Sequence, residues 1–148
     1  AEDNLNAIGE ILIKDLKSRK LKIEELISKF ELDAVRKVEA KFLSGGMKRR
    51  LVISMSLLGD PEILLMDEPL AALDPQTIQM LQNIIIKLQS EYNLTILITD
   101  HQARDLLVVC DRAIILSNSK IVAEGTPNQL MQNEDATKHY FGSNFKFK

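Results

Sequence analysis

Two adjacent carboxylates, Asp67 and Glu68, end a short apolar run and stand immediately before a proline. The run itself, residues 63–66 (ILLM), predicts a buried strand. Neighbouring carboxylates repel each other, and a cation or a polarised water that shares the site relieves the repulsion. Mg²⁺ suits such a place because it prefers oxygen ligands and keeps several waters. On the dipeptide alone, the favoured interpretation is that the pair simply caps the following turn.

Three further motifs accompany the acids along the chain. Residues 43–46 (LSGG) stand before them, residues 73–75 (LDP) follow, and residues 99–101 (TDH) come after the next predicted strand. In an open parallel sheet, ligands bind just beyond the carboxyl ends of the strands, where loops and helix termini meet. The sequence therefore places Asp67 and Glu68 at an edge that could bind a ligand.

The LSGG motif has the composition of an anion site. Gly45 and Gly46 carry no side chains, so backbone N–H groups can approach a phosphate, and the positive end of the following helix adds to the attraction. Seen in isolation, the motif is equally well explained as an ordinary helix cap in which Ser44 satisfies a backbone N–H group.

His101 and Asp74 each have a structural interpretation as well as a functional one. A lone histidine such as His101 is more often a structural residue at the start of a helix. Asp74 stands directly before Pro75, and this order is typical of a residue that caps a helix opening with proline. A capping residue can also contact a partner, so both interpretations of Asp74 can hold together.

The remaining sequence predicts the elements that would position these motifs. Apolar residues at intervals of three and four predict helices over residues 5–16 and 22–30, and a third helix follows the glycines over residues 47–58. From residue 63 onward, strands (63–66, 95–99, 113–116) alternate with helices (76–90, 102–109). This alternation implies a parallel sheet that is covered on both faces.

The last predicted elements are a hairpin arm and a short helix. Residues 117–119 favour a turn, so residues 120–124 are expected to return antiparallel to the strand before them. Thr126 and Pro127 resemble a helix cap followed by a proline at the first helical position, and residues 128–131 continue that helix.

Composition excludes several classes of protein. The chain has 148 residues, of which 45% are hydrophobic and 27% charged, so it has ordinary globular proportions. Its formal charge of −2 argues against a nucleic-acid partner. Cys110 is the single cysteine, which permits no internal disulfide and favours a reducing, cytoplasmic setting. No apolar stretch approaches the roughly 20 residues that cross a bilayer, so membrane contact is expected only through partners.

In order and spacing, the motifs resemble those of ABC transporter ATP-binding subunits, from about residue 5 onward. LSGG resembles the family's signature motif, residues 63–68 its Walker B strand with the catalytic glutamate, residues 72–74 its D-loop, and the histidine after TD its switch histidine. Any one of these would arise by chance, whereas four in the family's order are highly specific. The resemblance implies an α/β fold: the C-terminal part of an ABC-type P-loop nucleotide-binding domain, with a parallel sheet flanked by helices and part of a helical subdomain.

The resemblance also implies a role for each residue near the predicted strand ends. Asp67 would hold Mg²⁺, often through a water, and Glu68 would orient or deprotonate the water that attacks ATP. His101 would sense the γ-phosphate and stabilise charge in the transition state.

The signature motif and the D-loop imply a dimer. In the family, the loop that corresponds to Ser44, Gly45 and Gly46 reaches the γ-phosphate of ATP on the opposite subunit. Asp74 would line the dimer seam. The implied partners are a second copy of the subunit, which closes around the nucleotides, and the transmembrane subunits of a transporter.

One family motif, the phosphate-binding loop GxxxxGK[ST], does not occur in the sequence. By the resemblance, the adenine-stacking strand, this loop and the glutamine-bearing loop would precede residue 1. We therefore expect residues 1–41 to be a partial helical subdomain, residues 42–132 an ATPase core without its phosphate loop, and residues 133–148 a C-terminal tail. Such a chain is expected not to bind or hydrolyse ATP alone, and to expose apolar faces of the strand at residues 63–66.

Within the family, residues 98–107, 125–135 and 139–147 are most similar to the ATPase subunits of lipopolysaccharide exporters. That resemblance implies a homodimer on the inner face of the bacterial inner membrane, beneath two membrane proteins. The alternatives are an ATPase subunit of branched-chain amino-acid importers and a non-enzymatic remnant that lends its LSGG to a complete subunit. Phe141, Phe145 and Phe147 in the tail could simply pack a terminal segment onto the domain.

Four residues depart from the family's usual pattern. Met55 stands where these proteins usually carry an arginine, and Lys48 and Arg49 replace a more typical glutamine-rich stretch after the glycines. Ala71 replaces the common serine of the D-loop. These departures bear on fine dimer contacts and leave the expected fold unchanged.

Overall fold

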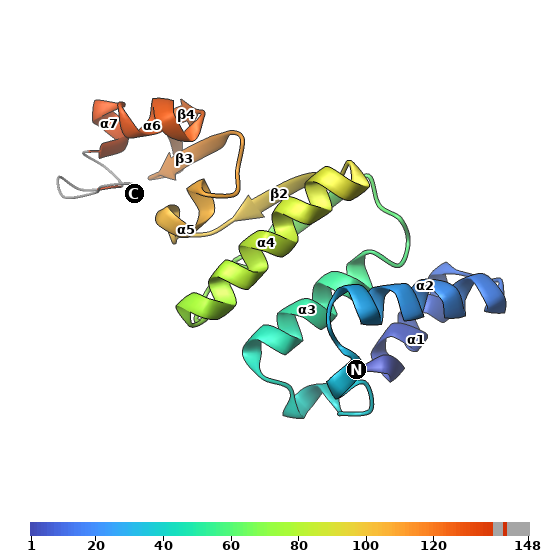
Figure 1. Ribbon diagram of the computed structural model, residues 1–148. Coiled ribbons are helices and arrows are strands. Elements are labelled where there is room, and N and C mark those ends of the chain that lie inside the picture. Colours follow the sequence, from blue (N-terminus) through green and yellow to red (C-terminus); the bar gives the residue numbers. More distant parts are fainter. Residues whose placement is uncertain (138–140, 142–148) are drawn as a thin grey trace.

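The computed structural model describes residues 1–137 and residue 141, and it begins with helices and continues as an α/β unit (Figure 1). The elements are α1 (Glu2–Leu12), α2 (Leu16–Lys29), the 3₁₀ turns η1 (Asp33–Val35) and η2 (Ala40–Phe42), α3 (Gly45–Ser56), β1 (Ile63–Asp67), α4 (Pro75–Tyr92), β2 (Thr95–Thr99), α5 (Ala103–Leu107), β3 (Ala113–Ser117), β4 (Lys120–Gly125), α6 (Pro127–Met131) and α7 (Glu134–Ala136). The predicted order of helices and strands is confirmed.

The boundary between the first two helices differs from the prediction. The predicted helix over residues 5–16 ends at Leu12, because Ile13 has extended backbone angles. Asp15 then begins α2 as its N-cap, and its carboxylate accepts a 2.7 Å hydrogen bond from the Ser18 backbone N–H group. The apolar spacing runs on across the turn, so the cap decides the boundary.

The described strands form two separate sheets of two strands each. In the first, β1 pairs with β2 in parallel, in a register that sets Asp67 opposite Thr99. In the second, β4 pairs with β3 antiparallel, which confirms the predicted hairpin. A capping box between Thr126 and Gln129 starts α6, as the Thr126-Pro127 pair predicts.

The two faces of the β1–β2 sheet differ in burial. Leu64 and Met66 point into the core, while Ile63, Leu65 and Leu97 are 61%, 69% and 60% exposed. The prediction of a sheet covered on both faces is therefore wrong for the described residues, because their helices supply core packing to one face only. The expected exposure of apolar side chains on β1 is confirmed.

The core is built mainly from helices packed on that covered face. In Figure 1, α4 runs alongside β2, and α3 lies between α4 and the pair α1–α2. One hydrophobic cluster joins Leu5, Leu26, Leu51, Leu64 and Leu81, each 6% exposed or less. Full burial of one such side chain stabilises a fold by about 1.5–3 kcal/mol. A second, smaller cluster lies between the β3–β4 hairpin and the helices that follow it.

The expected internal divisions of the chain stay predictions. The larger cluster takes residues from both sides of residue 41, from Ala1 to Leu94. Of the expected tail at residues 133–148, residues 138–140 and 142–148 lie outside the described residues, and so do Phe145 and Phe147. Phe141 packs against the smaller cluster.

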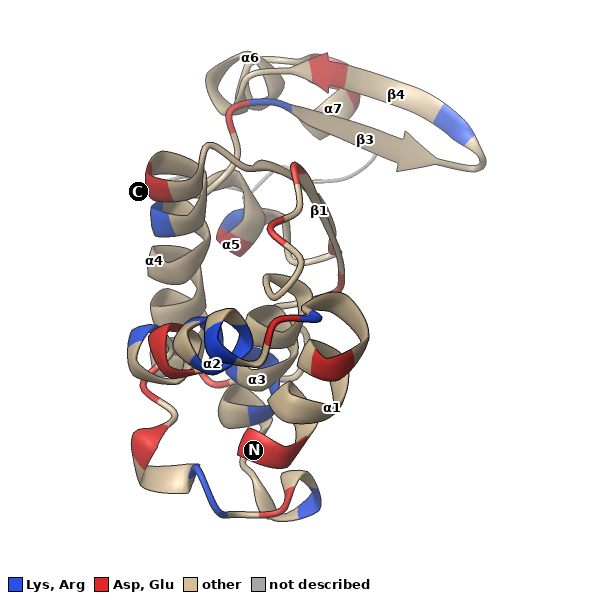
Figure 2. Ribbon diagram, turned by 90° about the vertical axis from the view of Figure 1, so that its right-hand side faces the viewer, with Lys and Arg blue, Asp and Glu red and all other residues tan. Residues whose placement is uncertain are grey.

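Charged residues of both signs are interspersed over the helices and loops (Figure 2). This mixture fits the formal charge of −2 for the whole chain. Within residues 1–137 and residue 141, no helix has the length and apolarity that a membrane span requires.

Candidate functional site

The register of β1 and β2 brings the predicted acids and histidine to one edge of the sheet. Because the strands are parallel and Asp67 lies opposite Thr99, the loops that follow them leave the sheet side by side. The Glu68 backbone N–H group donates a 2.7 Å hydrogen bond to the Thr99 carbonyl, which joins the two loops at their start. The Thr99 hydroxyl donates to Oδ1 of Asp67. We call Asp67 and Thr99, which end β1 and β2, together with Glu68 and His101 in the loops that follow, the carboxylate edge.

Glu68 and His101 face each other at the carboxylate edge. Nδ1 of His101 lies 3.5 Å from Oε1 of Glu68, and the two side chains are 70% and 47% exposed. Both groups can therefore reach a ligand from solvent while they remain close to each other. A carboxylate that accepts a proton, placed beside an imidazole that donates a hydrogen bond, is suited to general base catalysis with charge stabilisation.

The backbone of Glu68 has an unusual conformation. Its φ angle is +46°, in the left-handed region that non-glycine residues seldom adopt, and Ala72 in the same loop has a φ angle of +56°. The left-handed conformation costs roughly 1–2 kcal/mol for an L-residue. Such backbone strain persists only where surrounding contacts hold it, and it is concentrated at functional sites.

Asp100 fastens the two loops together, a role that the sequence did not reveal. Its carboxylate accepts hydrogen bonds from the Leu70 N–H group at 3.1 Å and the Gln102 N–H group at 2.9 Å. Leu70 belongs to the loop that follows Glu68, so Asp100 sets the spacing between that loop and His101. The only signal in the sequence was an acid directly after a predicted strand.

The glycine turn, residues 44–46, begins α3 at a different place in the fold. Ser44 caps the helix by accepting a 3.3 Å hydrogen bond from the Met47 N–H group, which confirms the structural interpretation of Ser44. The packing of α4 also explains why residue 46 is a glycine, because a Cβ atom there would lie 2.7 Å from Cγ2 of Thr77. A Cβ atom on Gly45 would meet its nearest neighbour, Leu73, at an ordinary 3.4 Å. The anion-binding interpretation of these residues stays a prediction.

Asp74 caps α4, as one of its two interpretations predicts. Its carboxylate accepts hydrogen bonds from the Thr77 hydroxyl and from the Thr77 backbone N–H group, and Pro75 is the first residue of the helix. These hydrogen bonds, the hydroxyl's first, lower the pKa of Asp74. Because a Cβ atom on Gly46 would meet the Thr77 side chain, the glycine turn and Asp74 have Thr77 as a common neighbour.

A metal ion at the carboxylate edge would need ligands beyond the protein. Over the part of the chain that the structure describes, no three acidic, histidine or cysteine side chains converge to hold a metal. Asp67 offers one exposed carboxylate, and the group hydrogen-bonded to it is the neutral hydroxyl of Thr99. This donor set fits Mg²⁺ that arrives with a nucleotide, since Mg²⁺ is usually bound by one or two carboxylates together with waters and phosphates.

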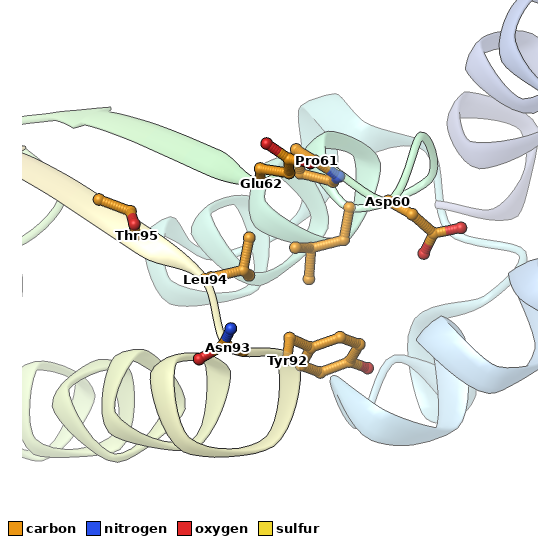
Figure 3. Close-up of a pocket in the computed structure, with 8 residues that line it drawn as sticks. Asp60, Pro61, Glu62, Tyr92, Asn93, Leu94 and Thr95 are labelled. Atoms are coloured by element: carbon orange, nitrogen blue, oxygen red, sulfur yellow. The ribbon is translucent and has the colours of Figure 1, made fainter.

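A pocket of about 500 Å³ lies at the opposite end of the same sheet (Figure 3). Its lining includes residues 60–62, which precede β1, and residues 92–94, which precede β2. Asp67 lies five positions along the strand from Glu62 of the pocket, a distance of roughly 16 Å. The pocket is therefore not part of the carboxylate edge.

Comparison with known proteins gives one consistent picture of what the chain resembles. A family model described as ABC transporter matches residues 2–71. The lipopolysaccharide export system ATP-binding protein LptB of Haemophilus influenzae is 41% identical over 146 residues, which cover 97% of this chain and 60% of that protein. The Escherichia coli K12 protein of the same name is 37% identical, with the same coverage. The chain thus spans about 60% of the length of these relatives.

Solved structures of the same kind share the fold. An ATP-binding cassette of an ABC transporter, MJ1267, superposes with a TM-score of 0.80 at 23% identity, over 94% of this chain and 62% of that one. The cbiO1 protein of Clostridium perfringens, described as part of the ABC transporter complex cbiONQ, gives a TM-score of 0.74 at 21% identity, over 84% and 49% of the two chains. At these identities the likeness concerns the fold.

Proposed function

Since the chain belongs to the ABC transporter ATP-binding family, we propose that it carries the hydrolytic half of a transporter ATPase subunit. The substrate is ATP, and Mg²⁺ is the cofactor. One observation supports this above all: Glu68 and His101 lie 3.5 Å apart at the carboxyl ends of adjacent parallel strands, beside Asp67. Open α/β sheets bind their ligands at such a place.

The three side chains take complementary roles in this proposal. Mg²⁺, when bound, neutralises charge on the phosphate oxygens. Asp67, whose carboxylate is exposed, would hold the ion. Glu68 orients the attacking water and accepts its proton, and His101 donates a hydrogen bond to the γ-phosphate as charge develops there. The Thr99 hydroxyl keeps one oxygen of Asp67 in place.

The glycine turn serves a second copy of the subunit. Ser44, Gly45 and Gly46 stand at the N-terminus of α3, a helix of 12 residues whose dipole favours an anion. A Cβ atom on Gly45 would lie nearest to Leu73, and one on Gly46 nearest to Thr77, so the two glycines lie beside the residues around the start of α4. In the proposed homodimer they approach the γ-phosphate bound by the partner, and Asp74 lies along the seam between the two copies.

The proposed transport process is lipopolysaccharide export, in which the subunit works at the cytoplasmic face of the bacterial inner membrane with transmembrane partners. The LptB relatives, at 41% and 37% identity over 97% of this chain, support this assignment. The subunit reaches the membrane through those partners. The tail residues 139–147, which contribute to the resemblance, lie outside the described residues apart from Phe141.

Hydrolysis is tested in the intact subunit that contains these residues. Release of phosphate from Mg-ATP is expected in the unmodified subunit, and Glu68→Gln should lower turnover by about 10²–10⁴-fold while ATP binding is retained. The amide keeps the size of the side chain and removes the base. Undiminished turnover in Glu68→Gln would exclude Glu68 from this role.

The 148-residue chain alone is expected not to bind ATP tightly. It has no GxxxxGK[ST] loop to surround a triphosphate, and the carboxylate edge brings negative charge rather than cations to the nucleotide. Calorimetric titration with Mg-ATP should show no binding at micromolar concentrations. A tight complex would mean that the described residues bind phosphates in a way this proposal does not contain.

A further inference from the structure

We propose that Arg49 is a positioning residue, which ties the helix of the glycine turn to the backbone of Glu68. Nη2 of Arg49 on α3 donates a 3.1 Å hydrogen bond to the Glu68 carbonyl. In the sequence the two residues are 19 positions apart, and neither the family motifs nor the spacing pointed to this contact. The consequence for catalysis rests on the proposed function, whereas the structural claim does not.

The donor is held in place by the core. Arg49 is half-buried, and its neighbours along α3 include Leu51 and Ile53, which are 3% and 5% exposed. The position of α3 is therefore fixed by packing against the rest of the larger cluster. Arg49 acts from this fixed helix, so its hydrogen bond constrains the loop that bears Glu68.

The acceptor belongs to the residue with the strained backbone. The Glu68 φ angle of +46° is unfavourable for a residue with a Cβ atom. Its N–H group is held by Thr99 at 2.7 Å, and its carbonyl accepts hydrogen bonds from Arg49 at 3.1 Å and from the Ala71 N–H group at 3.3 Å. A carbonyl oxygen has two lone pairs, so it can accept both bonds.

Without Arg49, the Glu68 carbonyl keeps only the longer bond from Ala71. That bond lies inside the same loop and would move with it, so no hydrogen bond from α3 to the Glu68 backbone would then resist relaxation of the left-handed conformation. A change in φ at Glu68 redirects its side chain, and the 3.5 Å approach to His101 would be lost. Arg49 thus acts on catalysis through Glu68 and does not itself touch the reacting atoms.

This contact also links two sites of the proposed dimer. Arg49 lies one helical turn after Gly45, on the same helix. A displacement of α3 when the glycine turn engages the partner's nucleotide would carry Arg49 with it and shift the Glu68 peptide. The helix therefore couples the ligand state of one site to the position of the base in the other.

The neighbouring cations provide matched controls. Lys48 is exposed on the same turn of α3, so Lys48→Met removes an equal charge and leaves the Glu68 carbonyl bonded. Arg50 bonds to Glu31 and to the Phe30 carbonyl and not to Glu68, so Arg50→Met tests the loss of a structural arginine.

The first experiment is NMR spectroscopy of the 148-residue chain, which needs no nucleotide. Arg49→Met should move the Glu68 Cα and Leu70 amide resonances and abolish the nuclear Overhauser contact between the Glu68 and His101 side chains. Arg49→Lys, which keeps one donor group, should restore part of the change. Lys48→Met and Arg50→Met should leave all three signals in place.

Unchanged Glu68 and His101 signals in Arg49→Met would overturn the proposal. If that variant does not fold, Arg49→Leu replaces it, since leucine also lacks a side-chain N–H donor and the same resonances should change. An equal effect of Lys48→Met would also overturn the proposal, because it would assign the change to charge rather than to the hydrogen bond.

A second experiment separates this inference from the proposed function. In the intact subunit, Arg49→Met should lower kcat by about ten- to a hundred-fold and change the KM for ATP little, because a displaced base affects the chemical step. A rise in KM alone would contradict the positioning role. If the unmodified subunit hydrolyses no ATP, the proposed function fails, and the NMR result still decides whether Arg49 positions Glu68.

Discussion

The carboxylate edge and the glycine turn are held by different kinds of contact. At the carboxylate edge, hydrogen bonds join residues that are about 30 positions apart, from Thr99 to Asp67 and from Leu70 to Asp100. In the glycine turn, the cap of Ser44 spans three residues, and the longer contact is the packing of Gly46 against Thr77. The first depends on tertiary structure, and the second largely on local structure.

This difference indicates how each region responds to substitution. Side chains at the carboxylate edge are exposed and add little to packing, so their removal should affect chemistry more than stability. The glycine turn has no spare space at Gly46, so a change there should affect stability first. The following predictions test the contrast.

The largest expected effect is on turnover at the carboxylate edge. His101→Ala in the intact subunit should lower the rate of ATP hydrolysis by about 10²–10³-fold, because a donor to the developing charge is removed. The side chain is 70% exposed, so the thermal midpoint should stay unchanged. A lower midpoint with an unchanged rate would reverse the contrast between the two regions.

The next effect concerns the stability of the glycine turn. Gly46→Ala puts a Cβ atom 2.7 Å from Cγ2 of Thr77, and we expect it to lower the free energy of unfolding by about 1–3 kcal/mol. Urea denaturation of the 148-residue chain measures this directly.

Two variants control this prediction. Gly45→Ala meets its nearest atom at 3.4 Å and should be nearly neutral. Thr77→Ser removes the clashing methyl group and keeps the hydroxyl that bonds Asp74, so it should rescue Gly46→Ala in the double variant. Equal losses of stability in Gly45→Ala and Gly46→Ala would mean that both positions need glycine for backbone freedom and not because of the contact with Thr77.

A smaller effect is expected at Thr99. Thr99→Val removes the hydroxyl that donates a hydrogen bond to Asp67. An exposed hydrogen bond of this kind contributes about 0.5–1 kcal/mol to the free energy of unfolding, and urea denaturation should show a loss of that size. Valine suits a strand as well as threonine does, so the backbone should not change. Thr95→Val at the other end of β2 is the matched control, and an equal loss there would show that the bond to Asp67 is not responsible.

The smallest expected effect is the pH dependence of the Asp74 cap. Its hydrogen bonds with Thr77 lower the pKa in the folded state below the ordinary 3.8. The folded state therefore binds the proton less readily than the unfolded state does. The contribution of the cap is fully present above pH 3.8 and is lost as the pH falls through the folded pKa.

Asp74→Asn separates the charge from the cap. Asparagine also caps helices but does not titrate, so the variant should lose less stability than the unmodified chain as the pH falls below 3.8. Denaturation midpoints across the acid range measure the difference. If the stability of the two proteins fell in parallel with pH, the ionisation of Asp74 would not contribute to the pH dependence of stability.

The sequence predicted those features that depend on short-range order. The strand before Asp67, the cap at Asp74 and the hairpin at β3–β4 follow from local pattern, and the structure has them all. The extent of the helices near Asp15 did not follow, because one side-chain cap overrides a continuous apolar spacing.

Contacts between distant elements could not be read from the motifs. Asp100 and Arg49 act on the loop after β1 from other elements, and their roles depend on the register of two strands and on the packing of α3. The exposed face of β1 and β2 shows the same limit, since the apolar run at residues 63–66 cannot tell which face finds a partner. For Asp100, the one available signal was its place directly after a predicted strand.

The most direct test of the account is a crystal structure of the intact subunit carrying Glu68→Gln, with Mg-ATP bound. The account predicts that the γ-phosphate lies between residue 68 and His101, with Mg²⁺ beside Asp67. A nucleotide bound elsewhere, with Asp67 and His101 both facing solvent, would contradict it.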